Sequence, residues 1–245
     1  MSDLTTKTPL SAREVIMREA RRLFAARGID GVSTREIMKA AGQKNTASLG
    51  YYFGSKENLV RELIIDGAKV IDDRRNHWLD ELEANGSPTT VREVTDIIIF
   101  SAVRMSEESD THEDSYIRFI THIGQHHPEL FYSTLGDKWA AGFTRCFDHL
   151  RRLMPDMPHA VKTQRIRFIT GYLGSVLSFR EQALTGRLEK QGLWAYEATL
   201  HHFSQTMAAI IEAPYESAAF ADIDFDSITE DESMSAFMGN GNSSE

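Results

Sequence analysis

The residues with the clearest chemical potential lie between Ser33 and Leu59, in the sequence STREIMKAAGQKNTASLGYYFGSKENL. Ser33 and Thr34 stand where a helix is predicted to begin, so their hydroxyls lie beside the free backbone amides of a first helical turn. These groups, together with the positive end of the helix dipole, suit a phosphate oxygen. The stretch therefore predicts contact with a phosphate backbone.

Two short helices around a tight turn are predicted to hold those groups in place. Ser33 is followed three residues later by Glu36, the spacing at which the serine caps the helix and the glutamate returns the bond. Residues 41–44 form the turn, and a third helix follows, capped by Asn45 or Thr46.

The flanking residues predict where this helical head begins and ends. An amphipathic helix is predicted over residues 11–27, and Gly28 ends it. The third helix is predicted to end at Tyr52 or Phe53, because residues 54–55 are a Gly-Ser pair that breaks and recaps the chain.

The rest of the chain also reads as helical. A pattern from Lys56 to about Ala84 is predicted to couple the head to the body, and the Ser-Pro pair at 87–88 fits the start of a fifth helix. No strand alternation or repeat is evident, so the fold class is predicted to be all-α. Further helices are expected over residues 113–124, about 129–153, 159–185 and 190–213.

Four segments follow from this pattern. Residues 1–10 are expected to be a flexible arm, 11–54 a helix-turn-helix domain and 55–213 a helical domain. Residues 214–245 are rich in Asp, Glu, Ser, Gly and Asn. This tail is predicted to be disordered, because single apolar residues cannot build a core.

The charge is distributed unevenly along the chain, whose net charge is -9. Residues 1–70 carry twelve Lys and Arg against eight Asp and Glu, a local charge of +4. Residues 214–245 carry eight acidic side chains and no Lys or Arg. A small basic head on an acidic body is the distribution expected when only the head meets nucleic acid.

The composition narrows the class of protein. The 41% hydrophobic and 26% charged residues suit a globular chain. The single cysteine, Cys146, can form no internal disulfide, and no segment is apolar enough to span a membrane, so we expect a cytoplasmic protein. Phosphate loops, nucleophile elbows and paired acids are absent from the sequence, so neither an enzyme nor a cofactor is expected.

About 60 residues at the N-terminal end resemble the TetR/AcrR family of transcriptional regulators. The order that carries the resemblance is Arg13, Ala20, Leu23-Phe24, Gly28, Ser33-Thr34, Ile37, Ala41-Gly42, Tyr52-Phe53, Ser55-Lys56-Glu57 and Leu59. The resemblance implies a homodimeric, all-helical protein with a DNA-binding head and a C-terminal domain that dimerises and holds a small effector. The segment from Gly42 to Tyr51 has one residue more than the usual family pattern, which changes the face that the third helix presents.

The resemblance also implies which residues meet DNA. Lys44, Tyr52 and Lys56 match phosphate-contacting positions, and these join the two hydroxyl residues at the start of the second helix. Such contacts position a protein, whereas base edges specify the sequence. The candidates for base edges are Asn45, Thr46, Ser48, Leu49 and Tyr51, with Asn45 suited to adenine and Leu49 to a thymine methyl. The alternatives are that Asn45 only caps and that the two tyrosines belong to the core.

One predicted helix has a side nearly without bulk, which lets another helix approach closely. We interpret this as a dimer interface in which two helices from each subunit form a four-helix bundle, with packing inside one subunit as the alternative. The residues assigned to it are Gly171, Gly174, Ser175, Ser178, Tyr196, Phe203 and Met207.

Residues 97–147 are dense in aromatic side chains, methionine and histidine, which suits either a core or an apolar effector cavity. His122 and His126 stand one helical turn apart, but without a third ligand we expect no metal there. The residues chosen for the cavity wall are Phe100, Met105, Phe119, His122, Trp139 and Phe143.

Together these patterns predict a homodimeric repressor of a double-stranded DNA operator, released from a pseudo-palindromic site by a small apolar or amphipathic effector of unknown identity. The alternative is an activator, or an effector-independent DNA-binding protein whose acidic tail docks a protein partner.

Overall fold

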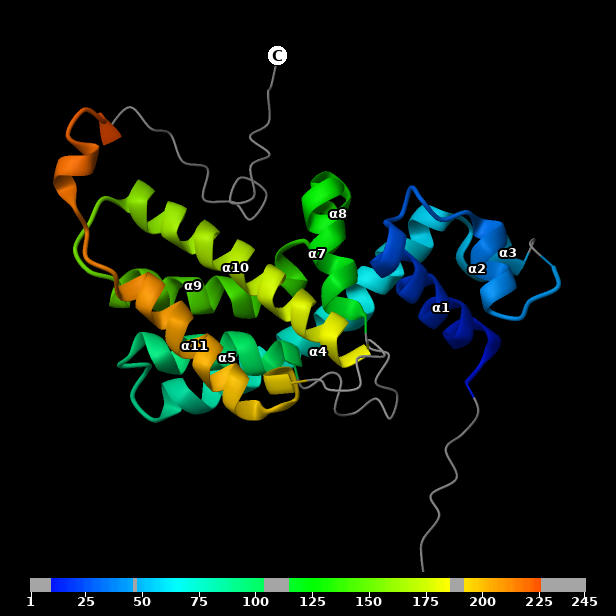
Figure 1. The fold of residues 1–245 in the computed structure, drawn as a ribbon, viewed down its shortest axis with the longest axis horizontal. Helices are drawn as coiled ribbons and strands as arrows, with labels where there is room; N and C mark the ends of the chain where they lie inside the picture. Colours follow the sequence, from blue (N-terminus) through cyan, green and yellow to red (C-terminus); the bar gives the residue numbers. More distant parts are fainter. Residues whose placement is uncertain (1–9, 46–47, 104–114, 186–191, 226–245) are drawn as a thin grey trace, which may run out of the picture.

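The structure, a computed structural model, describes residues 10–45, 48–103, 115–185 and 192–225, and every regular element in these ranges is a helix. An N-terminal head and a larger helical body lie side by side along the long axis (Figure 1). The all-α fold class predicted from the sequence is confirmed. Thr46 and Met105, both predicted site residues, fall outside the described residues.

The head consists of α1 (Ala12–Arg27), α2 (Thr34–Ala40) and α3 (Ser48–Phe53). Two capping boxes begin its helices, because Ser11 with Glu14 and Ser33 with Glu36 each exchange both bonds between side chain and backbone. Gly28 ends α1 at a φ of 73°, the left-handed region that glycine adopts without a side-chain clash. The Ser33–Glu36 box and the end at Gly28 were predicted correctly, because these signals are local, whereas the Ser11–Glu14 box was not predicted.

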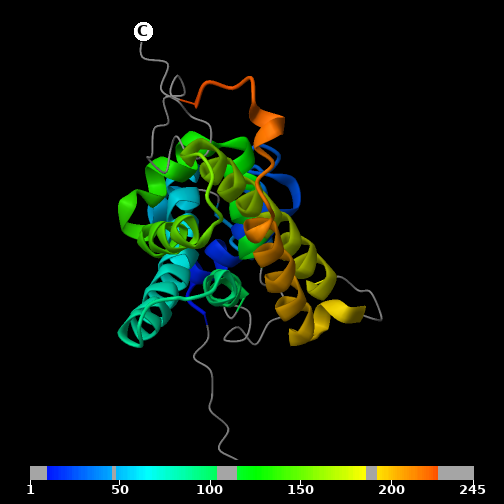
Figure 2. The same cartoon turned by 90° about the vertical axis from the view of Figure 1, so that its left-hand side faces the viewer.

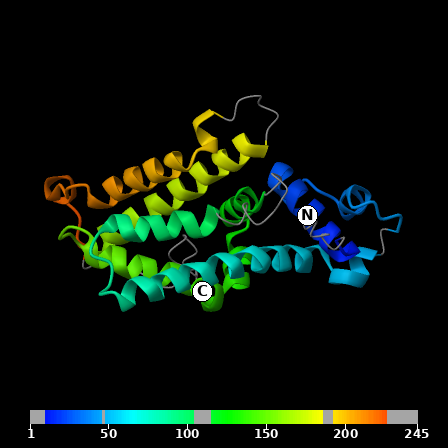
Figure 3. The ribbon, with the colours of Figure 1, turned by 90° about the horizontal axis from the view of Figure 1, so that it is seen from below.

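The helix α4 (Lys56–Ala84) joins the head to the body, and its bounds match the prediction. Ser55 caps it by accepting a bond from the amide of Asn58 at 3.0 Å. Figure 3 shows α4 running from the head along the whole base of the body.

The body packs the remaining helices over α4. In Figures 2 and 3, α10 and α11 lie side by side on the opposite side of the body from α4, and α5 lies between α11 and α4. The elements are α5 (Val91–Val103), α7 (Tyr116–His126), α8 (Pro128–Leu135), η1 (Asp137–Trp139), α9 (Ala141–Leu153), α10 (His159–Thr185), η2 (Gly192–Ala195), α11 (Glu197–Glu212) and η3 (Ser217–Phe220).

Three predicted helices have different bounds in the structure. The helix expected over 190–213 is α11, which begins at Glu197 after the separate helix η2. The helix α5 begins at Val91 rather than after Ser87, because Thr90 and Glu93 form the cap and Ser87 takes a positive φ of 72°. The single helix expected over about 129–153 is divided into α8, η1 and α9, because Gly136 leaves the helical region with a φ of 51°.

The first part of the acidic tail has local order that composition did not predict. The ring of Phe220 in η3 lies 5.5 Å from Tyr215 and 6.1 Å from Phe225 between ring centroids. Nearby, Arg165 donates from Nη1 to the carbonyl oxygens of Ile211 and Ala213, at 2.8 and 2.6 Å, and so holds the end of α11. Three aromatic rings close together give residues 215–225 a small cluster of their own.

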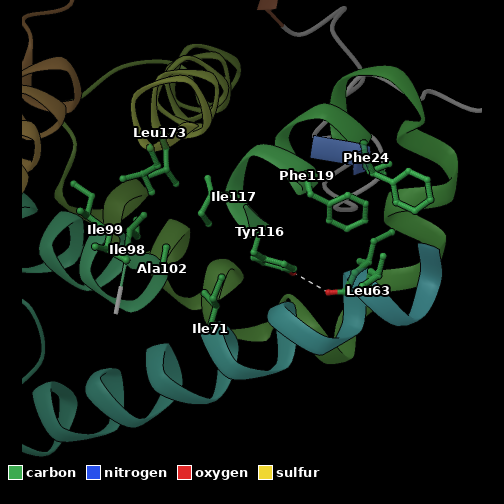
Figure 4. Packing of buried hydrophobic residues seen from close by; sticks show 14 of the residues in the cluster. Phe24, Leu63, Ile71, Ile98, Ile99, Ala102, Tyr116, Ile117, Phe119 and Leu173 are labelled. Atoms are coloured by element: carbon green, nitrogen blue, oxygen red, sulfur yellow. Dashed lines mark hydrogen bonds between the residues drawn. The ribbon is translucent and has the colours of Figure 1, made fainter. Parts of the chain in front are cut away.

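The position of α7 against α4 depends on a glycine in α4. The ring of Tyr116 is 1% exposed and lies against Gly67, where an added Cβ would approach the ring to 2.3 Å. The Tyr116 hydroxyl donates to the carbonyl oxygen of Ile64 at 2.8 Å, as the dashed line in Figure 4 shows. Glu181 of α10 accepts bonds from the first backbone amides of α7, at 2.9 Å from Ile117 and 2.8 Å from Arg118.

Gly67→Ala should destabilise the protein by about 1–3 kcal/mol, because the added methyl would overlap the Tyr116 ring, whose hydroxyl is bonded to the Ile64 carbonyl oxygen. The control is Gly50→Ala in α3, where an added Cβ meets nothing within 4 Å. That change should be neutral or slightly stabilising. Urea unfolding at matched protein concentration measures both, and equal effects would contradict the packing argument.

Candidate nucleic-acid interface and internal cavity

The turn between α2 and α3 has a defined geometry. Gly42 takes a φ of 67°, and the amide of Gln43 donates to the carbonyl oxygen of Met38 at 2.9 Å, a pattern typical of a glycine-terminated helix. The amide of Ser48 donates to the carbonyl oxygen of Asn45 at 3.2 Å just before α3. These bonds fix residues 41–43 against the end of α2.

Most cations of α1 are paired with carboxylates. Arg22 contacts Glu19 at 3.0 Å, and Arg27 contacts Glu36 at 2.9 Å. Arg13 pairs with Glu62 of α4. These arginines hold the head together and attach it to α4, so the basic residues of α1 contribute little free positive charge.

The cations of α2 and the following turn are different. Arg35, Lys39 and Lys44 are exposed, and none of them has an ion pair or a hydrogen bond from its charged group within the described part of the chain. Arg35 and Lys39 are four residues apart and so share one face of α2. Beside them, Thr34 is exposed at the helix start. Two of these cations, Arg35 and Lys39, were missed by the sequence analysis.

The helix α3 presents a clear outward face. Tyr51 is 84% exposed, and Ser48 lies one turn earlier on the same side. Leu49 is only 4% exposed and belongs to the core, so the prediction that it meets a thymine methyl is wrong. In the register that α3 adopts, Leu49 points inward, Tyr51 points outward and Ser48 is half-buried. Figure 1 shows α2 and α3 at the end of the molecule away from α10 and α11.

Other predicted contacts have roles inside the head. The Lys56 ammonium donates to the carbonyl oxygen of Ile29 and lies 5.8 Å from the ring centroid of Phe24. Lys56 therefore anchors the α1–α2 loop to α4. A phosphate that contacts Lys56 would share its ammonium group with the Ile29 carbonyl oxygen. Tyr52 is half-buried against the core, with its ring edge-on to Tyr51. The hydroxyl of Ser33 is engaged in its capping box with Glu36. Bonds from the Ser33 amide, the Ser33 hydroxyl and Arg27 to the Glu36 carboxylate lower its pKa to about 2.

The body contains a partly open cavity of about 460 Å³ between α4, α7, α8, α9 and α10. Apolar and aromatic side chains make up most of its wall, which is typical of a site for a small organic ligand. The helix α7 contributes a stripe at helical spacing. The lining includes Ile71, Arg75, Tyr116, Ile117, Ile120, Thr121, Phe131, Tyr132, Leu135, Trp139, Phe143, Phe147 and Arg167.

Three of the residues predicted to line the cavity, Phe100, Phe119 and His122, lie elsewhere in the structure. Trp139 and Phe143 do line the cavity. The ring centroid of Phe100 instead lies 4.9 Å from that of His201 in α11. Phe119 of α7 is fully buried against Phe24 of α1. His122 lies at the head, against Gly28. Aromatic density in the sequence did not distinguish residues that fill the core from residues that surround a space.

Arg75 of α4 is the unexpected member of the cavity wall. Its side chain is 2% exposed, and its guanidinium carbon lies 3.7 Å from the centroid of the Phe143 ring. Burial lowers the pKa of Arg75. Asp72, one turn earlier, accepts bonds from the Gly142 amide at 2.8 Å and the Asn76 side chain at 2.9 Å, and its pKa is raised by burial.

The helix α7 touches the head as well as the cavity. The ring of Phe119 stacks on Phe24 of α1 with centroids 6.2 Å apart, as Figure 4 shows. A Cβ added to Gly28 would lie 2.4 Å from Nε2 of His122, so this ring packs directly on the end of α1. His127 contacts the Asp30 carboxylate at 3.1 Å. One helix thus borders both the internal space and the head.

The predicted dimer residues divide between two environments. Phe203 and Met207 are 3% and 0% exposed and pack inside the body, where α11 lies on α5, so their assignment to an interface is wrong. Gly174 faces Thr121 of α7, where an added Cβ would approach Oγ1 to 3.2 Å. Ser178 is half-buried.

An apolar stripe does face outward from α10. Phe168 and Phe179 are 60% and 61% exposed, and Gly171 and Ser175 lie between them at helical spacing. Leu193 and Tyr196, at and beside η2, are also exposed, at 77% and 63%. This outer stripe includes three of the seven predicted interface residues, namely Gly171, Ser175 and Tyr196.

The described residues were also compared with the requirements of a metal site, a reactive thiol and a membrane span. No group of three or more metal-binding side chains occurs among the described residues, and His126 turns its Nδ1 to the His122 carbonyl oxygen at 3.0 Å. Burial raises the pKa of the Cys146 thiol to about 12, so the thiol is unreactive at neutral pH. Within the described ranges, no helix combines the length and apolar character needed to cross a membrane.

These features define a helix-turn-helix head on a helical body with an internal cavity. Residues 16–63 match the family model described as bacterial regulatory proteins, tetR family. This match confirms, for the N-terminal segment, the resemblance to the tetR family noted from the sequence. The family is one of regulators, in agreement with the expectation of a protein that is not an enzyme.

A similar curated protein is the HTH-type transcriptional repressor AcnR of Corynebacterium efficiens, 35% identical over 68 residues. That match covers 28% of this chain and 36% of the repressor, so the chain spans about a third of the length of the curated relatives it matches. The AcnR repressor of Corynebacterium glutamicum matches to the same extent.

Solved structures resemble the whole fold. The superantigen PfiT has a TM-score of 0.52 at 16% identity, with 85% of this chain and 100% of that chain covered. A tetR family transcription regulator from Shewanella sp. PV-4, described as putative, has a TM-score of 0.50 at 16% identity, covering 81% and 96% of the two chains. At this identity the likeness concerns the fold alone.

The position of His122 predicts a pH-dependent stability. Partial burial, followed by the neighbouring His126 and His127, lowers the pKa of His122 below its ordinary value of 6.5, while Asp30 opposes the shift. Unfolding restores the ordinary pKa, so the unfolded chain binds more protons as pH falls below 6.5. The contribution of His122 to stability should be complete above pH 6.5 and decline below it.

Urea unfolding at pH 7.5 and pH 5.5 measures this effect in the wild type and in His122→Gln. The loss of stability at the lower pH should be smaller in His122→Gln. His202→Gln is the matched control, because His202 of α11 is exposed and forms no ion pair or hydrogen bond from its side chain within the described residues. An identical pH dependence in wild type and His122→Gln would contradict the argument.

Proposed function

We propose that the protein is a homodimeric transcriptional repressor that binds a pseudo-palindromic DNA operator and is released from it by a small amphipathic effector. The observation that carries the proposal is the group of three unpaired cations on α2 and the turn, beside the outward face of α3. Cations without carboxylate partners are available to phosphates, and Tyr51 and Ser48 are placed to approach base edges.

The dimer is supported by the apolar stripe on α10. Phe168 and Phe179 are large exposed aromatic side chains of the kind that mark protein interfaces. A two-fold axis through this stripe brings two α10 helices and two α11 helices together and leaves one head on each side. Two heads reach successive major grooves when their recognition helices lie about 34–36 Å apart.

The cavity and the head share α7, which supports release by an effector. A ligand in the cavity contacts residues such as Ile120 and Thr121 on one face of α7. Other residues of the same helix, Phe119 and His122, contact α1. An effector that favours a shifted α7 therefore also favours a different head position, and a coupling of about 1–3 kcal/mol changes DNA affinity 5- to 150-fold.

The DNA-binding part is tested on a duplex selected by the wild type from a random library. Lys39→Ala and Lys44→Ala should each weaken binding at all sequences, because they remove phosphate contacts rather than base contacts. Since a dimer carries two copies, each change should reduce the slope of log affinity against log salt by about 1.8. Electrophoretic shift assays over a salt series measure this slope.

Arg22→Ala is the matched control, since Arg22 is paired with Glu19 in α1. It should leave the salt slope near that of the wild type. Selection of no duplex by a dimeric wild type, even at low salt, would overturn the proposed DNA binding, and an equal slope change for Arg22→Ala would remove α2 as the phosphate-binding face.

Phe179→Glu should convert the dimer into a monomer, because the change places a charge in an apolar stripe that the dimer would desolvate. Analytical ultracentrifugation measures the mass. Leu10→Glu is the control, because Leu10 is 49% exposed and lies before α1, outside the stripe. A dimer that survives Phe179→Glu unchanged would place the interface elsewhere.

A further inference from the structure

The cavity contains a charge without a partner. Arg75 lines the wall at 2% exposure, and its Nε is buried without a hydrogen bond. Within the described residues its guanidinium group forms neither an ion pair nor a hydrogen bond, and it lies over the Phe143 ring. An isolated buried charge is costly unless something pairs with it.

Asp72 does not satisfy this need. Its carboxylate carries the opposite charge and lies one turn away, which lowers the cost of burying Arg75. However, Asp72 is not part of the cavity wall, and both of its oxygens are occupied, one by the Gly142 amide and the other by the Asn76 side chain. The donors of Arg75 therefore remain available on the cavity side.

The rest of the wall indicates what kind of molecule can use those donors. The charged residues that line the cavity in the described structure are Arg75 and Arg167, both positive, and no Asp or Glu joins them there. The Tyr132 hydroxyl, also in the wall, is buried without a hydrogen-bond partner, and burial raises its pKa. The remaining wall is mainly apolar, so the space is suited to one polar end and a hydrophobic body.

We propose that the cavity binds an amphipathic organic anion, such as a carboxylate or sulfonate on an apolar body, with its charged group paired to Arg75. A guanidinium group donates two parallel bonds to such an anion, and the apolar body fills the space between Ile120, Phe131 and Leu135. This inference rests on the proposed function, because it names the chemical class of the effector.

The test compares two dyes that share a ring system and differ in charge. The anionic dye is 8-anilino-1-naphthalenesulfonate, and the neutral dye is N-phenyl-1-naphthylamine. Arg75→Met should weaken binding of the anionic dye about 10- to 100-fold, the equivalent of one lost charge-assisted pairing. The neutral dye should bind Arg75→Met as it binds the wild type. Fluorescence titration measures both affinities.

Lys69→Met is the matched control, because Lys69 is an exposed cation of the same helix that does not line the cavity. It should change neither affinity. Equal losses for both dyes in Arg75→Met, or an unchanged affinity for the anionic dye, would overturn the proposal. Circular dichroism verifies the fold, because Arg75→Met leaves the buried Asp72 carboxylate without its neighbouring cation.

A measurement on the wild type keeps the proposal testable if Arg75→Met does not fold. Decanoate should displace the neutral dye from the wild-type cavity at lower concentrations than decanol of equal chain length. Equal displacement by the acid and the alcohol would overturn the role of the charge. Operator binding by the ligand-free wild type is measured in parallel. A wild type that binds no DNA, with a charge-selective cavity, would contradict the proposed function but not this inference.

Discussion

The arrangement of this protein depends on the close packing of α7 against two glycines. Gly67 of α4 receives the ring of Tyr116, and Gly28 at the end of α1 receives the ring of His122. Both contacts exist because the glycine has no side chain, so α7 approaches the head and the long helix more closely than any other residue would permit. The cavity wall, the orientation of the head and the stacking of Phe119 all follow from this position.

The charged side chains of the described residues fall into two classes, those paired within the protein and those without a partner there. In α1 the arginines are paired with carboxylates and act as structural links, whereas the cations of α2 and the turn remain free in the described head. The same contrast occurs in the body, where Asp72 is fully hydrogen-bonded and Arg75 is not. The net charge of -9 conceals this, because function depends on the charges that lack partners.

The sequence predicted those features that depend on neighbouring residues. The capping box at Ser33, the length of α4 and the all-helical class were read correctly, since caps and apolar periodicity are local signals. Leu49, Phe119 and Met207 were misassigned because burial depends on which helix lies opposite. Arg75 gave no signal, since an arginine on an amphipathic helix is ordinarily exposed. The cavity is therefore a tertiary property that composition cannot locate.

The contacts of α7 with Gly28 and Gly67 also determine which positions the head can take relative to the body. A side chain can change its rotamer to follow a moving neighbour, but glycine has no side chain that could refill a gap. Any small displacement of α7 from Gly28 and Gly67 would open voids, and densely packed interiors resist such voids. Intermediate placements are therefore disfavoured, and the head is expected to switch between discrete positions rather than respond in proportion to each ångström of movement. Because Gly28 and Gly67 have no side chains, we expect the head to move only when the force on α7 exceeds a threshold.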